Sequence, residues 1–175
     1  VLDLGFAINW DAPVETAINV ENETTISGYR HSTGWAKNQK VFFVAEFSKP
    51  MSRYNLFQNK TKTEAKQVTG KTTAAQFFFD IDGSRDVIIK IAVSSVSVAN
   101  AKANLESDRD LDFETARAEA KKTWEQQLEK IVVETPVDSL KTIFYSALYH
   151  TQIAPVTFSD VNGEFRLEND SIVKA

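Results

Sequence analysis

The sequence predicts an α+β chain in which antiparallel strands come first and helices follow. The first half consists of short runs of β-branched and aromatic residues separated by turn residues, which is typical of antiparallel strands. The second half contains stretches without Gly or Pro, in which apolar residues recur at three- and four-residue spacing. With 175 residues, 42% of them hydrophobic, the chain can bury one sizeable core or a larger and a smaller one.

Most of the expected strands lie before residue 95. We predict strands at residues 2–8, 17–20, 24–29, 41–47, 74–80 and 87–94. Ala12-Pro13, Asn22-Glu23 and Gly34 are predicted to interrupt the early strands, and Pro50 to follow the end of strand 41–47. The polar, Lys-rich residues 51–73 indicate a long hairpin or loop, with a strand around residues 53–57.

Three helices are expected after residue 96. Ser97 is a suitable N-cap for an Ala-rich first helix, and a second helix is predicted to begin near Asp112. A third helix is predicted over residues 137–153, with Pro155 after its end. A brief strand is expected at residues 131–134. The Asn162-Gly163 pair predicts a hairpin turn between strands at 156–159 and 164–167.

Composition excludes several functional classes. The net charge is −4, with 20 Lys and Arg against 24 Asp and Glu, which argues against electrostatic binding of nucleic acid or membranes. The absence of Cys excludes disulfides, thiolate zinc sites and Cys nucleophiles. No apolar run is long enough to suggest a membrane span. The chain starts at Val1 without signal-peptide features, so we expect any signal peptide to have been removed or to lie outside this stretch.

Two local patterns imitate ligand-binding loops. Residues 68–72 resemble the end of a phosphate-binding loop, but a strand is predicted to follow where that loop needs a helix. Residues 108–119 have acidic residues at calcium-loop spacing, but Phe113 stands where such a loop requires Gly. We therefore favour an acidic helix start over a calcium loop. His31 and His150 are interpreted as structural or solvated rather than catalytic.

Aromatic residues offer a possible sugar-binding surface. Trp35, Tyr145 and Tyr149 could stack on the apolar faces of sugar rings. The alternative, which we favour for each residue, is packing at cores and layer interfaces. Trp35 is retained as a candidate substrate-binding residue.

Several segments in the right order resemble glycoside hydrolase family 92, the exo-acting bacterial α-mannosidases. The segments are Thr33-Gly34-Trp35, residues 47–50 (FSKP), residues 88–105 (IIKIAVSSVSVANAKANL), Asp112-Phe113, residues 124–128 (WEQQL), residues 143–150 (IFYSALYH) and residues 158–166 (FSDVNGEFR). Essentially the whole chain is covered. One departure follows Arg166, where the family pattern has Gly and then Asp but this chain has Leu167-Glu168-Asn169-Asp170.

The resemblance implies a fold and its division into domains. It implies an antiparallel β-sandwich over residues 1–95, a helical linker over 96–135, and the beginning of an (α/α) barrel catalytic domain over 136–175. The chain would then be an internal fragment, with a Gly-rich segment before Val1. The acid, base and calcium ligands of the family would lie beyond Ala175, so no catalytic or metal-ligating residue is assigned here.

The same resemblance implies a function. It implies a calcium-dependent, inverting exo-α-mannosidase, with an α-1,2 preference, that releases mannose from glycans and is periplasmic, secreted or at the cell surface. Calcium would hold and distort the sugar while an acid and a base flank the bond. The expected partners are a mannose-containing glycan and the rest of the barrel, covalently or as a second chain. The alternative is a non-catalytic carbohydrate-binding β-sandwich module.

Two further expectations concern the region after residue 136. Asp160 is a candidate substrate-binding residue, because a carboxylate at a turn above a barrel end could accept a hydrogen bond from a sugar hydroxyl. The alternative is an Asx-type turn, in which the Asp160 side chain caps its own backbone. The apolar face of the third helix would be exposed in an isolated fragment, which predicts self-association or a trimmed larger chain.

Overall fold

A computed structural model describes residues 1–8, 10–80, 83 and 86–175. The chain divides into two compact units. The first unit comprises Val1–Ser107 and Ser159–Ala175, and the second comprises Asp108–Phe158. The predicted domain boundaries after residues 95 and 135 stay a prediction.

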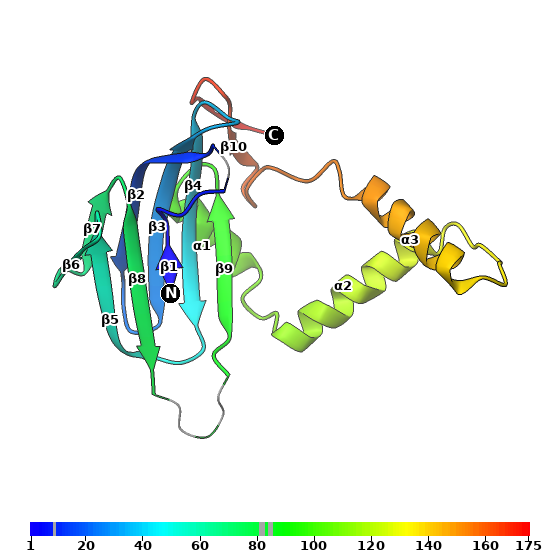
Figure 1. The fold of residues 1–175 in the computed structure, drawn as a ribbon, viewed down its shortest axis with the longest axis horizontal. Coiled ribbons are helices and arrows are strands. Elements are labelled where there is room, and N and C mark those ends of the chain that lie inside the picture. The colour runs from blue at the N-terminus through cyan, green and yellow to red at the C-terminus, as the bar shows by residue number, and fades with distance from the viewer. Residues whose placement is uncertain (9, 81–82, 84–85) are drawn as a thin grey trace. The chain divides into compact units, whose positions relative to one another are not determined.

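In its described residues the first unit contains two antiparallel sheets that form a sandwich, and a separate two-stranded hairpin near the end of the chain (Figure 1). The larger sheet has the strand order β7 (Gln67–Gly70), β2 (Ala12–Val20), β3 (Thr25–Thr33), β4 (Gln39–Phe47), β9 (Ile89–Ser94). The smaller sheet has the order β1 (Leu2–Asp3), β8 (Thr73–Phe79), β5 (Met51–Gln58), β6 (Thr61–Thr63). The predicted antiparallel sandwich followed by helices is confirmed.

The core of the first unit lies between the two sheets. Side chains alternate between the faces of a strand, so Phe43, Ala45 and Phe47 all point from β4 into the core. Leu56 contributes from β5 and is fully buried. The smaller sheet closes over these residues because Phe77 and Phe79 of β8 pack on Phe47, with ring centroids 5.4 Å and 5.1 Å from that of Phe47.

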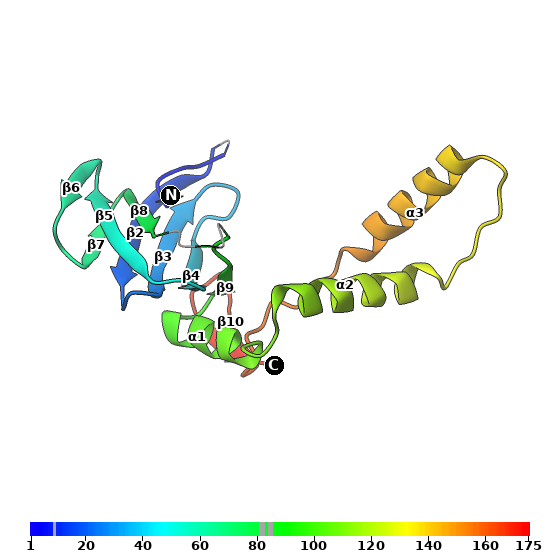
Figure 2. The same cartoon turned by 90° about the horizontal axis from the view of Figure 1, so that it is seen from below.

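The helix α1 (Val98–Ser107) covers the outer face of the larger sheet (Figures 1 and 2). Ala101 and Leu105 pack there against Val44 and the partly buried Ala92. The hydroxyl of Ser97 accepts a hydrogen bond from the Asn100 amide at 3.0 Å, which confirms the predicted N-cap.

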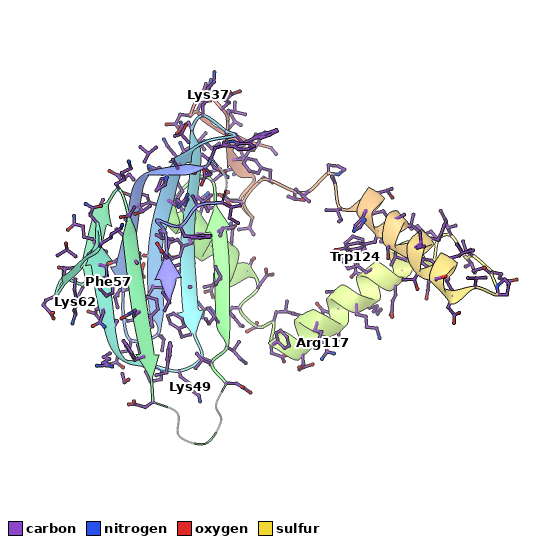
Figure 3. The ribbon with its side chains drawn as sticks, in the orientation of Figure 1. Lys37, Lys49, Phe57, Lys62, Arg117 and Trp124 are labelled. Carbon is purple, nitrogen blue, oxygen red and sulfur yellow. The ribbon has the colours of Figure 1, made fainter. Side chains whose placement is uncertain are left out.

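The second unit contains α2 (Phe113–Leu128) and α3 (Asp138–Gln152). Asp112 caps α2, because its carboxylate accepts from the Thr115 amide at 2.8 Å, which confirms the predicted helix start. Trp124, labelled in Figure 3, packs on Tyr149 with ring centroids 4.5 Å apart. The Tyr145 hydroxyl donates to the Ile131 carbonyl at 3.2 Å, so both tyrosines make contacts within this unit.

The apolar face of α3 is largely exposed within this unit. Leu140 and Ile143 keep 55% and 63% of their surface exposed. Self-association through this face stays a prediction. No helix in the described part of the chain is long and apolar enough to cross a membrane.

Two strand predictions near the end of the chain are wrong. Residues 131–134 and 156–159 form no strand, and β10 (Glu164–Arg166) pairs instead with β11 (Ile172–Lys174). Gly163 does form a turn, with φ of 84°, but the chain before the turn is not the partner strand. A turn signal identifies where the chain reverses, whereas the partner depends on which backbone edge lies nearby.

The early strands also differ from the prediction. The first strand ends at Asp3, because the Asp3 side chain accepts from the Gly5 amide at 2.8 Å and turns the chain. Pro13 lies inside β2 instead of interrupting it. The position tolerates proline because the ladder is irregular between Pro13 and Glu15, and β7 pairs only with residues 16–19 of β2.

Gly28 is required by close packing in the middle of the larger sheet. A Cβ atom at this position would lie 2.1 Å from the Ala17 carbonyl oxygen and 2.8 Å from the Phe43 ring. We expect Gly28→Ala to lower the free energy of unfolding by about 1–3 kcal/mol, measured by denaturant titration. The control Thr33→Ala, at the exposed end of the same strand, should change it by less than about 0.5 kcal/mol. Equal stability of the two variants would contradict this prediction.

Candidate functional site

Asp160 lies where the chain returns to the first unit, and it is buried, with 8% of its surface exposed. Its carboxylate accepts hydrogen bonds from the Ser94 hydroxyl at 2.6 Å, the Asn100 amide at 2.9 Å and the Asn104 amide at 2.7 Å. Ser94 ends β9, and the two asparagines lie one turn apart on α1. Burial of a carboxylate is tolerated here because both of its oxygens have donors.

The same asparagines hold the rest of the turn. The side-chain oxygen of Asn104 accepts from the Val161 amide at 2.9 Å, and the Asn100 amide also donates to Glu164 at 2.9 Å. The hydrogen bonds from Asn100 and Asn162 hold the pKa of Glu164 below its usual range. We call the residues Ser94, Asn100, Asn104, Asp160 and Glu164 the Asp160 cluster.

The hydrogen bonds of the Asp160 cluster show what the Asp160 carboxylate does within the fold. Its donors are side chains of β9 and α1, and the Asx-type contact in this turn comes from Asn162, whose oxygen accepts from the Glu164 amide at 2.9 Å. Asp160 therefore anchors the turn to the sandwich. Contact between Asp160 and a sugar stays a prediction.

Arg166 fastens the β10–β11 hairpin next to this cluster. Its guanidinium donates to the carbonyl of Ser95 at 2.7 Å, the carbonyl of Val96 at 2.8 Å and the carboxylate of Asp170 at 3.0 Å. Asp170 also forms an ion pair with Lys40, and these contacts, led by the Lys40 hydrogen bond, lower the pKa of Asp170. The hairpin is therefore tied to both the β9–α1 connection and β4.

Trp35 lies on the surface in the connection between β3 and β4, which Lys37 marks in Figure 3. It keeps 89% of its surface exposed and stacks on Trp10, with ring centroids 6.0 Å apart and an interplanar angle of 24°. Trp10 is 65% exposed, so the pair forms an apolar platform open to solvent. Trp35 is therefore exposed, whereas the interpretation favoured from the sequence was packing at a core or layer interface. Stacking of Trp35 on a sugar ring stays a prediction.

Sequence reasoning missed Trp10 as a neighbour of Trp35. The contact arises because Arg30 on β3 forms an ion pair with Asp11 and donates to the Phe6 carbonyl at 3.0 Å. The hydrogen bond from Arg30 holds the pKa of Asp11 below its usual range. Arg30 and Asp11 are far apart in sequence, and nothing in the local pattern indicates that they pair.

His31 lies in a ring cluster beside Tyr29 and Phe42, with centroid distances of 4.6 Å and 5.8 Å. Burial lowers the pKa of His31. The hydroxyl of Tyr29 donates to Glu15 at 2.7 Å. These contacts place His31 among packing residues.

Tyr29 gives a testable pH dependence. Burial, followed by its hydrogen bond to Glu15, raises the pKa of Tyr29 to about 12. The side chain of an unfolded tyrosine has a pKa of about 10, so Tyr29 keeps its proton to a higher pH in the folded state than in the unfolded state. The free energy of unfolding should therefore fall as the pH rises from about 10 to about 12. We expect tyrosinate absorbance to show a late transition that is absent in Tyr29→Phe. Identical titration curves for the two proteins would rule this out.

The described residues do not form a metal site. No group of three or more His, Asp or Glu side chains gathers in residues 1–8, 10–80, 83 and 86–175 in a way that could hold an ion. The described residues therefore do not fit a calcium site, and calcium stays a proposal in which the ligands come from outside this chain.

Family comparisons divide the chain much as its strands and helices do. Residues 1–94 match the glycosyl hydrolase family 92 N-terminal domain, and residues 100–175 match the family 92 catalytic domain. The two-sheet sandwich followed by helices is thus the N-terminal domain and the start of the catalytic domain of a glycoside hydrolase. The chain belongs to glycoside hydrolase family 92.

Solved structures agree with this assignment. The family GH92 α-mannosidase BT3965 from Bacteroides thetaiotaomicron is 30% identical, with a TM-score of 0.85, over 95% of this chain and 23% of that one. It is also known in complex with mannoimidazole. The GH92 inverting mannosidase BT2199 from Bacteroides thetaiotaomicron VPI-5482 is 24% identical, with a TM-score of 0.82, over 91% of this chain and 23% of that one, and shows the fold alone.

The chain therefore spans about a quarter of the length of these structures, 23% in each case. No curated protein matches the chain.

Proposed function

We propose that this chain is the N-terminal and linker part of an inverting exo-α-mannosidase that releases mannose from glycans, with a preference for α-1,2 linkages. The observation that supports the activity is the pair of family matches, over residues 1–94 and 100–175. The substrate class is supported by the 30% identical α-mannosidase and its complex with mannoimidazole.

The proposal assigns the chemistry to the rest of the catalytic domain, joined covalently or present as a second chain. An inverting glycosidase needs an acid and a base whose carboxyl groups are about 6.5–9.5 Å apart, so that a water fits between base and sugar. We place both carboxylates, and the ligands of a calcium ion, outside residues 1–175. In this proposal the enzyme is exported to the periplasm, the cell surface or the medium.

Within this chain, Asp160 and Trp35 are the proposed substrate contacts. Asp160 has a carboxylate at the turn that opens the β10–β11 hairpin, and Trp35 has an exposed indole face. A carboxylate can accept a hydrogen bond from a sugar hydroxyl, and an indole can pack on the apolar face of the ring.

The full-length protein tests the proposed activity directly. We expect it to release mannose from α-1,2-mannobiose, with β-mannose as the first product seen by NMR, and to lose activity when calcium is chelated and regain it when calcium is restored. Mannobioses of other linkages provide the comparison for linkage preference. Absence of mannose release from every α-mannobiose would refute the proposal.

The alternative of a carbohydrate-binding module is favoured by one observation, the exposed Trp10–Trp35 pair. If the sandwich binds sugar by itself, calorimetry of the 175-residue chain with mannose or mannobiose should show binding. Trp35→Ala should then reduce the affinity about 2- to 10-fold, because loss of an aromatic contact is worth about 0.5–1.5 kcal/mol. Trp124→Ala, in the second unit, is the matched control. No binding by the chain, together with mannose release by the full-length protein, would exclude the module.

A further inference from the structure

The core face of the larger sheet continues onto β9 without cover. In the pairing of β4 with β9, Phe43 lies opposite Val93, Ala45 opposite Ile91, and Phe47 opposite Ile89. Residues directly opposite each other in an antiparallel pair share a face of the sheet. The three β4 residues are at most 9% exposed, whereas Ile89, Ile91 and Val93 are 49%, 63% and 56% exposed.

The smaller sheet does not extend over this part of β9. Its edge strand β1 pairs with β8 only through Leu2 opposite Ala75 and Asp3 opposite Ala74. Among the described residues, no strand pairs with residues 77–79 of β8 on the β1 side. A groove of about 530 Å³ remains there, and its lining includes Val1, Phe77, Phe79, Ile89, Ile91 and Val93.

We propose that the polypeptide immediately before Val1 continues β1 along β8 and closes this groove. Extending the observed register places Val1 opposite Gln76, the first residue before Val1 opposite Phe77, and the third opposite Phe79. Phe77 and Phe79 face the core, where they contact Phe47, so the first and third residues face it too. These two positions carry apolar side chains that cover β9, and the second residue before Val1 faces outward beside Phe78.

The backbone of β8 is oriented to receive this strand. The Thr73 carbonyl accepts from the Leu4 amide at 3.0 Å, so Thr73 directs its backbone groups toward β1. Backbone groups alternate between the two edges of a strand, which directs those of Phe77 and Phe79 to the same edge. A strand of three or four more residues would pair them.

Continuity favours the preceding segment over other occupants. Val1 borders the groove, so a continuing strand needs no connecting loop and no loop-closure entropy. A second copy of the chain would need a separate free edge strand, together with the entropy cost of association. The matched structures are about four times longer than this chain, which covers 23% of each, so such proteins have further polypeptide available.

A disulfide in the full-length protein tests the register. The second residue before Val1 and Phe78 would form a non-hydrogen-bonded pair with a Cα separation of about 4.5 Å, which suits a disulfide. Phe78 is a suitable site because its ring faces outward under Arg53, 4.0 Å from the guanidinium carbon. In a background without other cysteines, cysteine at both positions should form an intrachain disulfide on mild oxidation, detected by mass spectrometry.

The matched control pairs Phe78→Cys with cysteine at the first residue before Val1. Those two side chains point to opposite faces of the sheet, so this pair should stay reduced. Failure of the first pair to form, or equal oxidation of both pairs, would overturn the proposal. An interchain disulfide would overturn it in favour of a second copy.

Hydrogen exchange of the unmodified full-length protein gives a second readout. The Phe77 and Phe79 amides should exchange at least about 100-fold more slowly than unprotected amides, because both donate to the added strand. Rapid exchange at both positions would overturn the proposal. Slow exchange at Phe77 and Phe79, combined with failure of the intrachain disulfide to form, would overturn the proposal and mean that a different segment covers the groove.

Discussion

Asp160→Ala is expected to lower the free energy of unfolding by about 3 kcal/mol, because buried donors lose their charged acceptor. The donors are the Ser94 hydroxyl and the Asn100 and Asn104 amides. The measurement is denaturant unfolding of the full-length protein and of the 175-residue chain. The control Asp110→Ala, at an exposed position outside the cluster, should change stability by less than about 0.5 kcal/mol.

Comparing Asp160→Ala with the separate variant Ser94→Ala distinguishes a role of Asp160 as an anchor from a contact of Asp160 with the sugar. Both substitutions remove the 2.6 Å hydrogen bond between β9 and the turn, but only Asp160→Ala removes the carboxylate. If Asp160 contacts the sugar, the kcat/KM of full-length Asp160→Ala should be about 10-fold or more below that of Ser94→Ala. Both variants are assayed well below their unfolding temperatures. Equal kinetic constants for the two variants would leave Asp160 as an anchor only.

Leu56→Ala should destabilise the sandwich by about 2–5 kcal/mol, because it removes a side chain from the closed part of the core. Leu56 is fully buried in β5 and packs in the cluster that joins the two sheets. The denaturation midpoint of the 175-residue chain measures this loss.

The matched control is Leu56→Met, which conserves volume and should cost less than about 1.5 kcal/mol. A loss of less than about 1 kcal/mol for Leu56→Ala would mean that the core relaxes around the cavity, and it would contradict the close packing of the two sheets.

Much of the secondary structure could be predicted from local chemistry. Ser97 and Asp112 cap helices because a short polar side chain can satisfy a free backbone amide within its own turn. Runs of β-branched and aromatic residues in 41–47 and 74–80 predicted strands that β4 and β8 confirm, within a residue or two at the ends. These signals act over a few residues, so they survive without knowledge of the fold.

Pairing and the candidate site could not be predicted in this way. β10 pairs with β11 rather than with residues 156–159, and Trp10 reaches Trp35 through an ion pair between Arg30 and Asp11. Asp160 was predicted from its turn, but its donors lie 56 to 66 residues away in sequence. Contacts of this range depend on how sheets and helices assemble.

The sequence by itself determined the α+β order of the chain, its helix caps and, through its ordered motifs, its resemblance to family 92. Only the tertiary structure decided that Asp160 is buried as an anchor and that Trp35 has a stacked neighbour. It also showed that the core face of β9 is left open beside Val1. The physical reason is range: propensity, capping and periodicity act between neighbours along the chain, whereas burial and side-chain partners are set when distant segments pack together.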